Sequence, residues 1–219
     1  MRQEIDLLEN YPKTRRNLDE RAQHRTEEHR RIARQFGKDF FDGERETGYG
    51  GYSYNPRFWE PVIPSFIAQY GLNKHSKILD VGCGKGFMLY DFTRLLPGIT
   101  VSGIDISEYA INNAKKEVRE FLQVGDAQFI PFEDNTFDLV ISITTVHNLE
   151  KAGCKKALQE IERVSKRDKF ITVDAYRTSE EKKRMDSWNL TALTYMSVDE
   201  WKSFFDEAGY TGDYYWFIP

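Results

Sequence analysis

The spacing of apolar and polar positions changes near residue 75. From there, short apolar runs typical of buried strands alternate with segments whose apolar residues recur every three or four positions, as on one face of a helix. The predicted strands are KILDV (77–81), ITVSGID (99–105), FDLVISI (137–143) and KFITVDA (169–175). The predicted helices are FMLYDFTRLL (87–96), SEYAINNAKKEV (107–118) and CKKALQEIERVS (154–165). Ser107 is the expected N-cap of the second helix, and Pro97-Gly98 ends the first.

Strands that alternate with helices predict a doubly wound α/β fold with a mostly parallel sheet. The last segment, YTGDYYWFI (210–218), is interpreted as a final antiparallel strand. Ligands of such sheets bind beyond the carboxyl ends of the strands. The predicted site is therefore built from the loops that follow Val81, Ile104, Val124, Ile143 and Val173.

Residues 1–74 differ in character and are expected to form a helical and aromatic cap. Positions 14–36 lack Gly and Pro and predict a highly charged helix. The stretch TGYGGYSYNPRFW (47–59) combines flexible glycines with aromatic area, which indicates a lid over a ligand. Residues 75–219 then form the main domain, with an insertion at about 177–197.

Composition limits the possible partners. The formal net charge of −4 gives no overall attraction to nucleic acid or to an anionic membrane. The sequence has no apolar signal region at its start and no apolar run of membrane-spanning length, so we expect a cytoplasmic protein without a membrane partner. Cys83 and Cys154 stand outside any CxxC pair and are expected to be free thiols.

The loop after the first strand, VGCGKGF (81–87), indicates the kind of cofactor. Its glycines, Gly82, Gly84 and Gly86, follow a GxGxG spacing, whereas the dinucleotide fingerprint is GxGxxG. Asp105 ends the second strand, where an acidic side chain can accept hydrogen bonds from both hydroxyls of a ribose. Asp126 follows the third strand at a place suited to an adenine edge, or it shapes a turn there. These features favour an adenosine-type ligand.

Four motifs occur in a fixed order along residues 75–175: ILDVGCGKGF, GIDIS, GDAQFIPF and FDLVISITTVHNL. In their order and approximate spacing, these residues resemble the class I S-adenosylmethionine-dependent methyltransferases. The resemblance implies S-adenosyl-L-methionine as cofactor. It also implies that Asp80, Gly82 and Gly84 hold the methionine part, with Gly86 in the same loop, and that Asp105 and Ile106 hold the ribose. Asp126 and Ala127 are the implied adenine contacts.

The methyl acceptor is harder to predict, because methyl transfer is an in-line displacement that needs few obligatory side chains. The segment SITTVHNLE lacks the Asn/Asp-Pro-Pro-Tyr/Phe signature of amino-methylating enzymes. His147 is a candidate general base, or it bonds the backbone, and Asp174 is a second catalytic candidate, or it caps the next segment. No metal site is expected, since these two ligands lack a third. Candidate substrate residues are Tyr49, Tyr52, Tyr54, Tyr176, Arg177 and Trp188, with Asn189 and Tyr195 as further possible pocket residues.

The predicted function is O- or N-methylation of a small polar molecule, similar to a sugar or an acid, under the lid. Three alternatives stay open. A nicotinamide-dependent oxidoreductase would bind NAD. A nucleic-acid methyltransferase would bind RNA through basic residues of the N-terminal helix, namely Arg15, Arg16, Arg21 and Arg25. An enzyme that methylates nucleic acid or intact protein would need an open groove for its substrate. A non-catalytic protein would bind the cofactor without consuming it.

Overall fold

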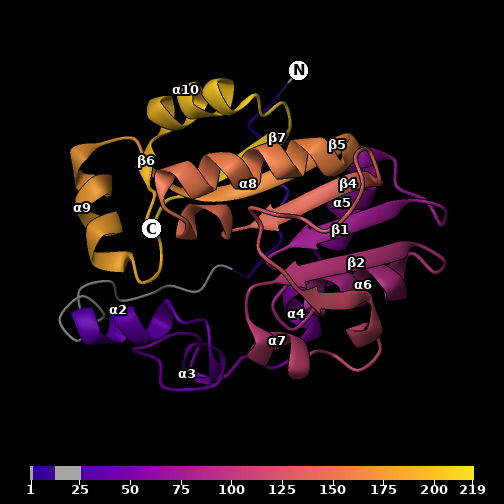
Figure 1. Cartoon of the computed structure of the whole chain (residues 1–219), viewed down its shortest axis with the longest axis horizontal. Helices are drawn as coiled ribbons and strands as arrows, with labels where there is room; N and C mark the ends of the chain where they lie inside the picture. The colour runs from indigo at the N-terminus through magenta and orange to yellow at the C-terminus, as the bar shows by residue number, and fades with distance from the viewer. Residues whose placement is uncertain (1, 13–25) are drawn as a thin grey trace.

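The computed structural model of the chain describes residues 2–12 and 26–219, and within them a parallel sheet forms the centre of the molecule (Figure 1). Its strands are β1 (Lys77–Val81), β2 (Thr100–Asp105), β3 (Leu122–Val124), β4 (Phe137–Ile143), β5 (Ser165–Tyr176), β6 (Met196–Ser197) and β7 (Asp213–Phe217). Their spatial order is β3-β2-β1-β4-β5-β6, and β7 also pairs with β5. The order reverses between β1 and β4, which is the switch point of a doubly wound sheet. The predicted fold class is confirmed.

One strand direction differs from the prediction. β7 runs parallel to β5, with Phe170 beside Asp213 and Asp174 beside Phe217, so the antiparallel interpretation of residues 210–218 is wrong. The reason lies in the connection that precedes it. Helix α10 (Val198–Ala208) starts near the carboxyl end of β5 and carries the chain back to its amino end, and a strand that follows such a crossover is parallel.

Helices cover both faces of the sheet (Figure 1). Side chains of α8 (Lys151–Val164) and α10 share one buried cluster with β4, β5 and β7. Side chains of α5 (Ile63–Tyr70), α6 (Phe87–Leu95) and α7 (Glu108–Asn112) share the other with β1 and β2. The remaining elements are α2 (Glu27–Ala33), α3 (Lys38–Phe41), α4 (Pro56–Trp59), α9 (Ser179–Trp188) and the short 3-10 helices η1 (Arg119–Phe121) and η2 (Val146–Asn148).

Helix α5 belongs to this core although it precedes the boundary expected at residue 74. The Phe66 ring lies edge-on to the Phe170 ring of β5, with 5.2 Å between their centroids. The first residues also reach the sheet, because Glu4 forms a parallel bridge with Tyr214 of β7. The N-terminal part of the chain therefore packs on β5 and pairs with β7.

The cap lies beside the carboxyl ends of the strands and contains α2 and α3 (Figure 1). A capping box between Thr26 and His29 begins α2, and the helix ends at Ala33. Within the described residues, the helix predicted for 14–36 is therefore limited to α2. The first part of that prediction lies outside the described residues, as do the basic residues proposed to bind RNA (Arg15, Arg16, Arg21 and Arg25).

Candidate cofactor and acceptor site

A cavity of about 910 Å³ opens at the carboxyl ends of the parallel strands. The loops after β1, β2, β3, β4 and β5 all contribute to its wall, as the topology predicts. Its other walls come from the N-terminal segment, the cap, the start of the loop after α9, and the C-terminal residues 215–219. The volume is at the upper end of the ~300–1,000 Å³ typical of ligand pockets, so it has room for more than a small ligand.

The three glycines of the first loop have different surroundings. A Cβ on Gly82 would lie 2.1 Å from Oγ1 of Thr145, and one on Gly86 would lie 2.7 Å from Cδ1 of Leu122. These two glycines therefore make room for protein side chains. Gly84 faces the cavity and the ring of Tyr52. Gly82 and Gly84 line the cavity, while Gly86 lies outside its wall and begins α6.

Two buried carboxylates, Asp80 and Asp105, line the cavity beside this loop, and the charge of Asp105 acts on Asp80. Asp105 accepts hydrogen bonds from the backbone N–H of Gly84 at 2.7 Å and from that of Ser107 at 2.8 Å. Burial raises the pKa of Asp105 above its ordinary value, although these two bonds oppose the shift. Burial and the nearby charge of Asp105 raise the pKa of Asp80 to about 7. The Asp80 carboxylate accepts no hydrogen bond in the described part of the chain.

The loops after β2 and β3 supply the next part of the wall. Ile106 lines the cavity and is more than half exposed, so its apolar side chain is open to a ligand. Asp126 and Ala127 line it from the neighbouring loop. The Asp126 carboxylate also accepts a bond from the backbone N–H of Gln128 at 2.8 Å. Asp126 therefore shapes a turn and borders the cavity at the same time.

The loop after β4 contains two residues that the sequence analysis did not single out. Thr144 has a φ of 50°, a left-handed conformation that is rare for a β-branched residue. Its backbone N–H donates to the side chain and the carbonyl of Thr172 in β5, which holds the strained turn. The turn places Thr145 in the space left by Gly82. Both threonines line the cavity.

His147 and Asp174 meet where the loops after β4 and β5 converge. Nδ1 of His147 accepts the backbone N–H of Asp174 at 3.0 Å, so a neutral ring carries its proton on Nε2. Burial lowers the pKa of His147 and raises that of Asp174, while their mutual attraction acts against both shifts. Nε2 lies 3.8 Å from the nearer carboxylate oxygen of Asp174, beyond hydrogen-bond distance. Both side chains line the cavity.

The cap is attached to the glycine loop by a polar cluster that the sequence did not reveal. Nζ of Lys85 lies 2.6 Å from Oδ2 of Asp42 and donates to the carbonyl of Tyr52 at 2.8 Å. Asp42 also accepts the backbone N–H of Tyr52 and the hydroxyl of Tyr109. Burial opposes ionisation of Asp42, but the hydrogen bonds from Lys85 and from the Tyr52 amide outweigh it and lower its pKa. These bonds hold the backbone of Tyr52 against the glycine loop.

The predicted substrate residues divide into two groups. Tyr49, Tyr52, Arg177 and Trp188 line the cavity, together with Asn189. Tyr54, Tyr176 and Tyr195 lie outside its wall. Tyr54 donates to the buried Asp91 of α6 at 2.7 Å, and Tyr195 donates to Asp186 at 2.9 Å. The hydroxyl of Tyr176 lies 3.5 Å from the Glu200 carboxylate.

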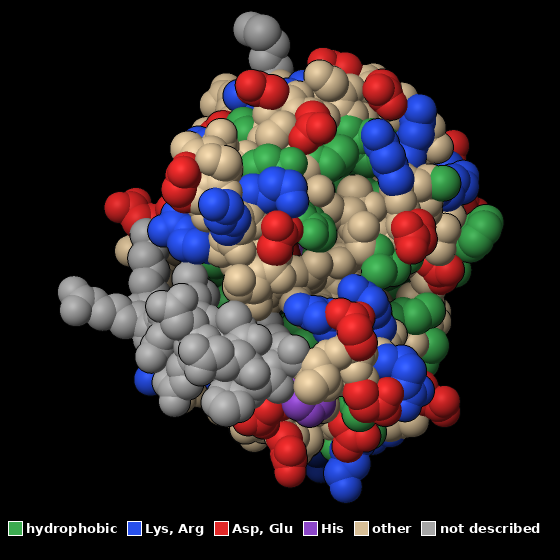
Figure 2. Space-filling model, turned by 90° about the vertical axis from the view of Figure 1, so that its left-hand side faces the viewer, with side chains coloured by type: hydrophobic (Ala, Val, Ile, Leu, Met, Phe, Trp, Pro, Cys, Tyr) green, Lys and Arg blue, Asp and Glu red, His purple; other side chains and the backbone are tan. Residues whose placement is uncertain are grey.

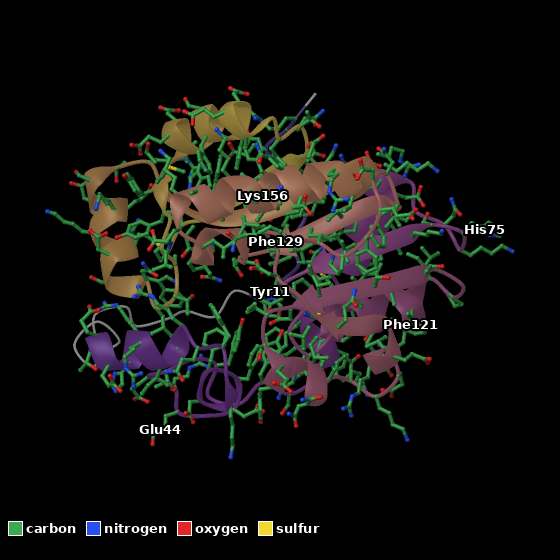
Figure 3. All side chains as sticks on the ribbon, in the orientation of Figure 1. Tyr11, Glu44, His75, Phe121, Phe129 and Lys156 are labelled. Carbon is green, nitrogen blue, oxygen red and sulfur yellow. The ribbon has the colours of Figure 1, made fainter. Side chains whose placement is uncertain are left out.

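Aromatic side chains from distant parts of the sequence form the rest of the wall. Tyr11 comes from the N-terminal segment and lies in the middle of the molecule, between the strand ends and the cap (Figure 3). Its ring is 5.1 Å from that of Trp59, measured between centroids. Tyr215 and Phe217 project from β7. We call Tyr11, Trp59, Trp188, Tyr215 and Phe217 the aromatic wall.

Some properties concern the described residues as a whole. Within 2–12 and 26–219, no helix is long and apolar enough to cross a membrane. The same ranges contain no group of three His, Cys, Asp or Glu side chains arranged to hold a metal ion. Cys83 and Cys154 are free and buried.

The sheet order and the position of the cavity define a Rossmann-like protein that binds an adenosine-type cofactor at its switch point. Comparison with known proteins identifies the family. Residues 72–209 match the family described as a methyltransferase domain, and the chain belongs to the class I S-adenosylmethionine-dependent methyltransferases. S-adenosylmethionine is the cofactor.

Individual relatives agree with this family. Demethylmenaquinone methyltransferase of Symbiobacterium thermophilum is 36% identical over 126 residues, which cover 53% of this chain and 49% of the relative. A tRNA (carboxymethyluridine(34)-5-O)-methyltransferase of Arabidopsis thaliana is 32% identical over 64% of this chain and 33% of the relative. The crystal structure of a SAM-dependent methyltransferase from Aquifex aeolicus is 25% identical, with a TM-score of 0.51 over 67% of this chain and 78% of that one. The chain spans about half the length of the first of these relatives.

The residues at the site fit this cofactor. Its methionine part carries positive charge, and the buried Asp80 carboxylate, which accepts no hydrogen bond from a described residue, faces the cavity beside Gly84. Each oxygen of Asp105 accepts one backbone hydrogen bond and keeps a lone pair for a ribose hydroxyl. A side chain at position 84 would narrow the gap between the loop and Tyr52.

Proposed function

We propose that the protein transfers the methyl group of S-adenosylmethionine to an oxygen or nitrogen atom of a small molecule enclosed in the cavity. One observation carries this proposal. The cofactor loop, the His147–Asp174 pair and the aromatic wall border the same cavity, and residues of the N-terminal segment and the cap line its other sides. An acceptor in this space can lie beside the cofactor and be shielded from water.

When bound, the cofactor supplies a sulfonium methyl group. The proposed roles of the protein are binding and orientation. Asp105 accepts the ribose hydroxyls, Asp80 pairs with the ammonium group of the methionine part, and Asp126 with Ala127 borders the adenine. Ile106 covers the ribose side of the cofactor. These residues hold the methyl carbon in a fixed direction, which is the main requirement of an in-line displacement.

Removal of a proton from the acceptor falls to the His147–Asp174 pair. Both groups are buried, lie at the carboxyl ends of β4 and β5, and border the cavity. The sequence suggested His147 as the general base. The Nδ1 lone pair of His147 accepts the backbone N–H of Asp174, and Nε2 carries the proton of the neutral ring. In this orientation the ring therefore has no free lone pair with which to take a proton from the acceptor.

Macromolecular acceptors fit the site less well. On the face that holds α9 and the cap, the Lys/Arg and Asp/Glu side chains of the described residues are interspersed with one another (Figure 2). Nucleic-acid binding instead draws on clustered positive charge. The similarity to the Arabidopsis tRNA enzyme keeps RNA as an outcome of the test, while the name of the Symbiobacterium relative supports a small acceptor.

The experiment incubates the protein with S-adenosylmethionine labelled in its methyl group and with an extract separated into RNA, protein and small-molecule fractions. We expect label in the small-molecule fraction, and none when Asp105→Ala replaces the wild type. Label in RNA or protein would contradict the small acceptor. Cofactor binding without label in any fraction would identify a non-catalytic binding protein.

A further inference from the structure

We infer that the acceptor is a flat, mainly apolar aromatic molecule with one hydroxyl or N–H group that donates a hydrogen bond to Asp174 and gives up its proton there. The inference rests on the proposed methyl transfer and names the class of molecule that this site accepts. Two features of the described residues support it. They are the composition of the cavity wall and the state of the Asp174 carboxylate.

The aromatic wall supplies flat apolar surfaces to the cavity. Its five rings come from the N-terminal segment, α4, α9 and β7, so the folded chain brings them together from four regions of the sequence. The rings of Trp188 and Phe217 are 5.5 Å apart at 40° to each other, and Tyr11 lies edge-on to Trp59. Aromatic ligands pack well in offset or edge-on contact with such rings.

A sugar is poorly matched to this wall. Each of its hydroxyls loses hydrogen bonds to water on entry, and a buried hydroxyl without a partner is costly. The aromatic wall offers such a molecule few partners. We therefore favour an aromatic acceptor over the sugar-like one expected from the sequence; an acid-like acceptor, which Arg177 in the cavity wall could bind, stays a prediction.

Asp174 provides the polar contact. Its side chain is 7% exposed and lines the cavity, yet its carboxylate accepts no hydrogen bond from a described residue. Because this carboxylate borders the cavity and has no hydrogen-bond donor among the described residues, its oxygens are open to a donor supplied from within the cavity. An acceptor hydroxyl or N–H is such a donor.

The backbone of Asp174 is fixed on both sides. Its N–H donates to Nδ1 of His147 at 3.0 Å, and its carbonyl accepts the indole N–H of the fully buried Trp201 at 2.9 Å. The two bonds hold the end of β5 and therefore the direction of the carboxylate. His147 is thus a positioning residue, and Asp174 is the proton acceptor.

The proposed step balances in atoms and electrons. The lone pair of the acceptor oxygen or nitrogen forms the new bond to the methyl carbon, and the carbon–sulfur bond breaks with its electron pair going to sulfur. The acceptor proton passes to the Asp174 carboxylate and later to water.

The test uses two matched probes, 2-naphthol and 2-methoxynaphthalene, which share their rings and differ in the hydroxyl hydrogen. D-glucose is the polar probe. Each is titrated calorimetrically into protein saturated with S-adenosylhomocysteine. We expect 2-naphthol to bind about tenfold more tightly than its methyl ether, as for a hydrogen bond to a charged group, and glucose to show no binding.

Variants assign the preference to a residue. Asp174→Leu keeps the branched shape, removes the acceptor oxygens and should abolish the tenfold preference. Asp174→Asn is isosteric, removes only the charge and should reduce the preference; it serves as the test if the leucine variant fails to fold. His147→Asn keeps an acceptor for the Asp174 N–H and should retain the preference.

Three results overturn the inference. They are absence of 2-naphthol binding, binding of glucose in its place, and a hydroxyl preference that survives in both Asp174 variants. Failure of the proposed function is seen separately in the labelling experiment, where label would enter RNA or protein or no fraction at all, whereas these titrations measure only which probe the cavity binds.

Discussion

Asp80 should make cofactor binding depend on pH between 5.5 and 7. The side chain is 5% exposed at the end of β1, and burial together with the charge of Asp105 raises its pKa to about 7. At pH 5.5 most molecules therefore carry a neutral Asp80. The proposed partner of this residue is the ammonium group of the cofactor, which interacts more strongly with the ionised carboxylate.

The magnitude follows from the fraction of ionised Asp80. With a pKa of about 7 that fraction is about 3% at pH 5.5 and about one half at pH 7, a ratio of about 16. An α-amino group titrates near pH ~8, so the cofactor keeps its positive charge over this window. Because the cofactor binds the ionised form, affinity is highest at the upper end and is lost as the pH falls below 7.

Calorimetric titration with S-adenosylmethionine at pH 5.5, 6, 6.5 and 7 measures this directly. We expect the dissociation constant to rise by roughly tenfold or more from pH 7 to pH 5.5 in the wild type. Asp80→Asn should bind weakly with little dependence on pH, and circular dichroism should show that both proteins stay folded. A constant affinity in the wild type, or an unchanged pH dependence in Asp80→Asn, would refute the reasoning.

Two further predictions concern the glycine loop. Lys85→Met leaves Asp42 without its buried cation, and we expect the free energy of unfolding to fall by about 2 kcal/mol. This is less than the ~3–5 kcal/mol lost when a fully buried pair is broken, because Asp42 keeps two other hydrogen bonds. Unchanged denaturant unfolding would show that this pair does not hold the cap. Gly82→Ala combines left-handed strain with a clash against Thr145 and should cost about 2–5 kcal/mol in the same assay. Gly71→Ala is the matched control, because Gly71 also has a positive φ but open space around the site of a Cβ. This variant should lower the free energy of unfolding by only ~1–2 kcal/mol. Equal losses in the two variants would show that Thr145 moves aside freely.

The sheet and the cofactor side of the site could be predicted because they depend on local patterns. Apolar runs bounded by Gly and Pro locate the strands, and parallel strands end at the same edge, so Asp80, Asp105 and Asp126 arrive at one cavity. The direction of β7 was predicted wrongly. An alternating strand looks the same in either direction, and here the direction is set by the path of α10.

The acceptor side depends on contacts between distant residues. Lys85 and Asp42 are 43 positions apart, and the charged sequence around each gives no sign that they pair. The N-terminal segment crosses to β7 before it reaches the cavity, which brings Tyr11 near Trp59. For Gly86 the sequence allowed a packing role as well as a cofactor contact, but only the structure shows that Leu122 is the residue packed against it.

Calorimetric titration of the wild type and of Asp105→Ala with S-adenosylmethionine, S-adenosylhomocysteine and NAD tests the central claim most directly. We expect the wild type to bind both adenosyl compounds and not NAD. Asp105→Ala, which loses the ribose contact and the bond to the Gly84 amide, should bind neither tightly. Binding of NAD alone, or full affinity in Asp105→Ala, would contradict it.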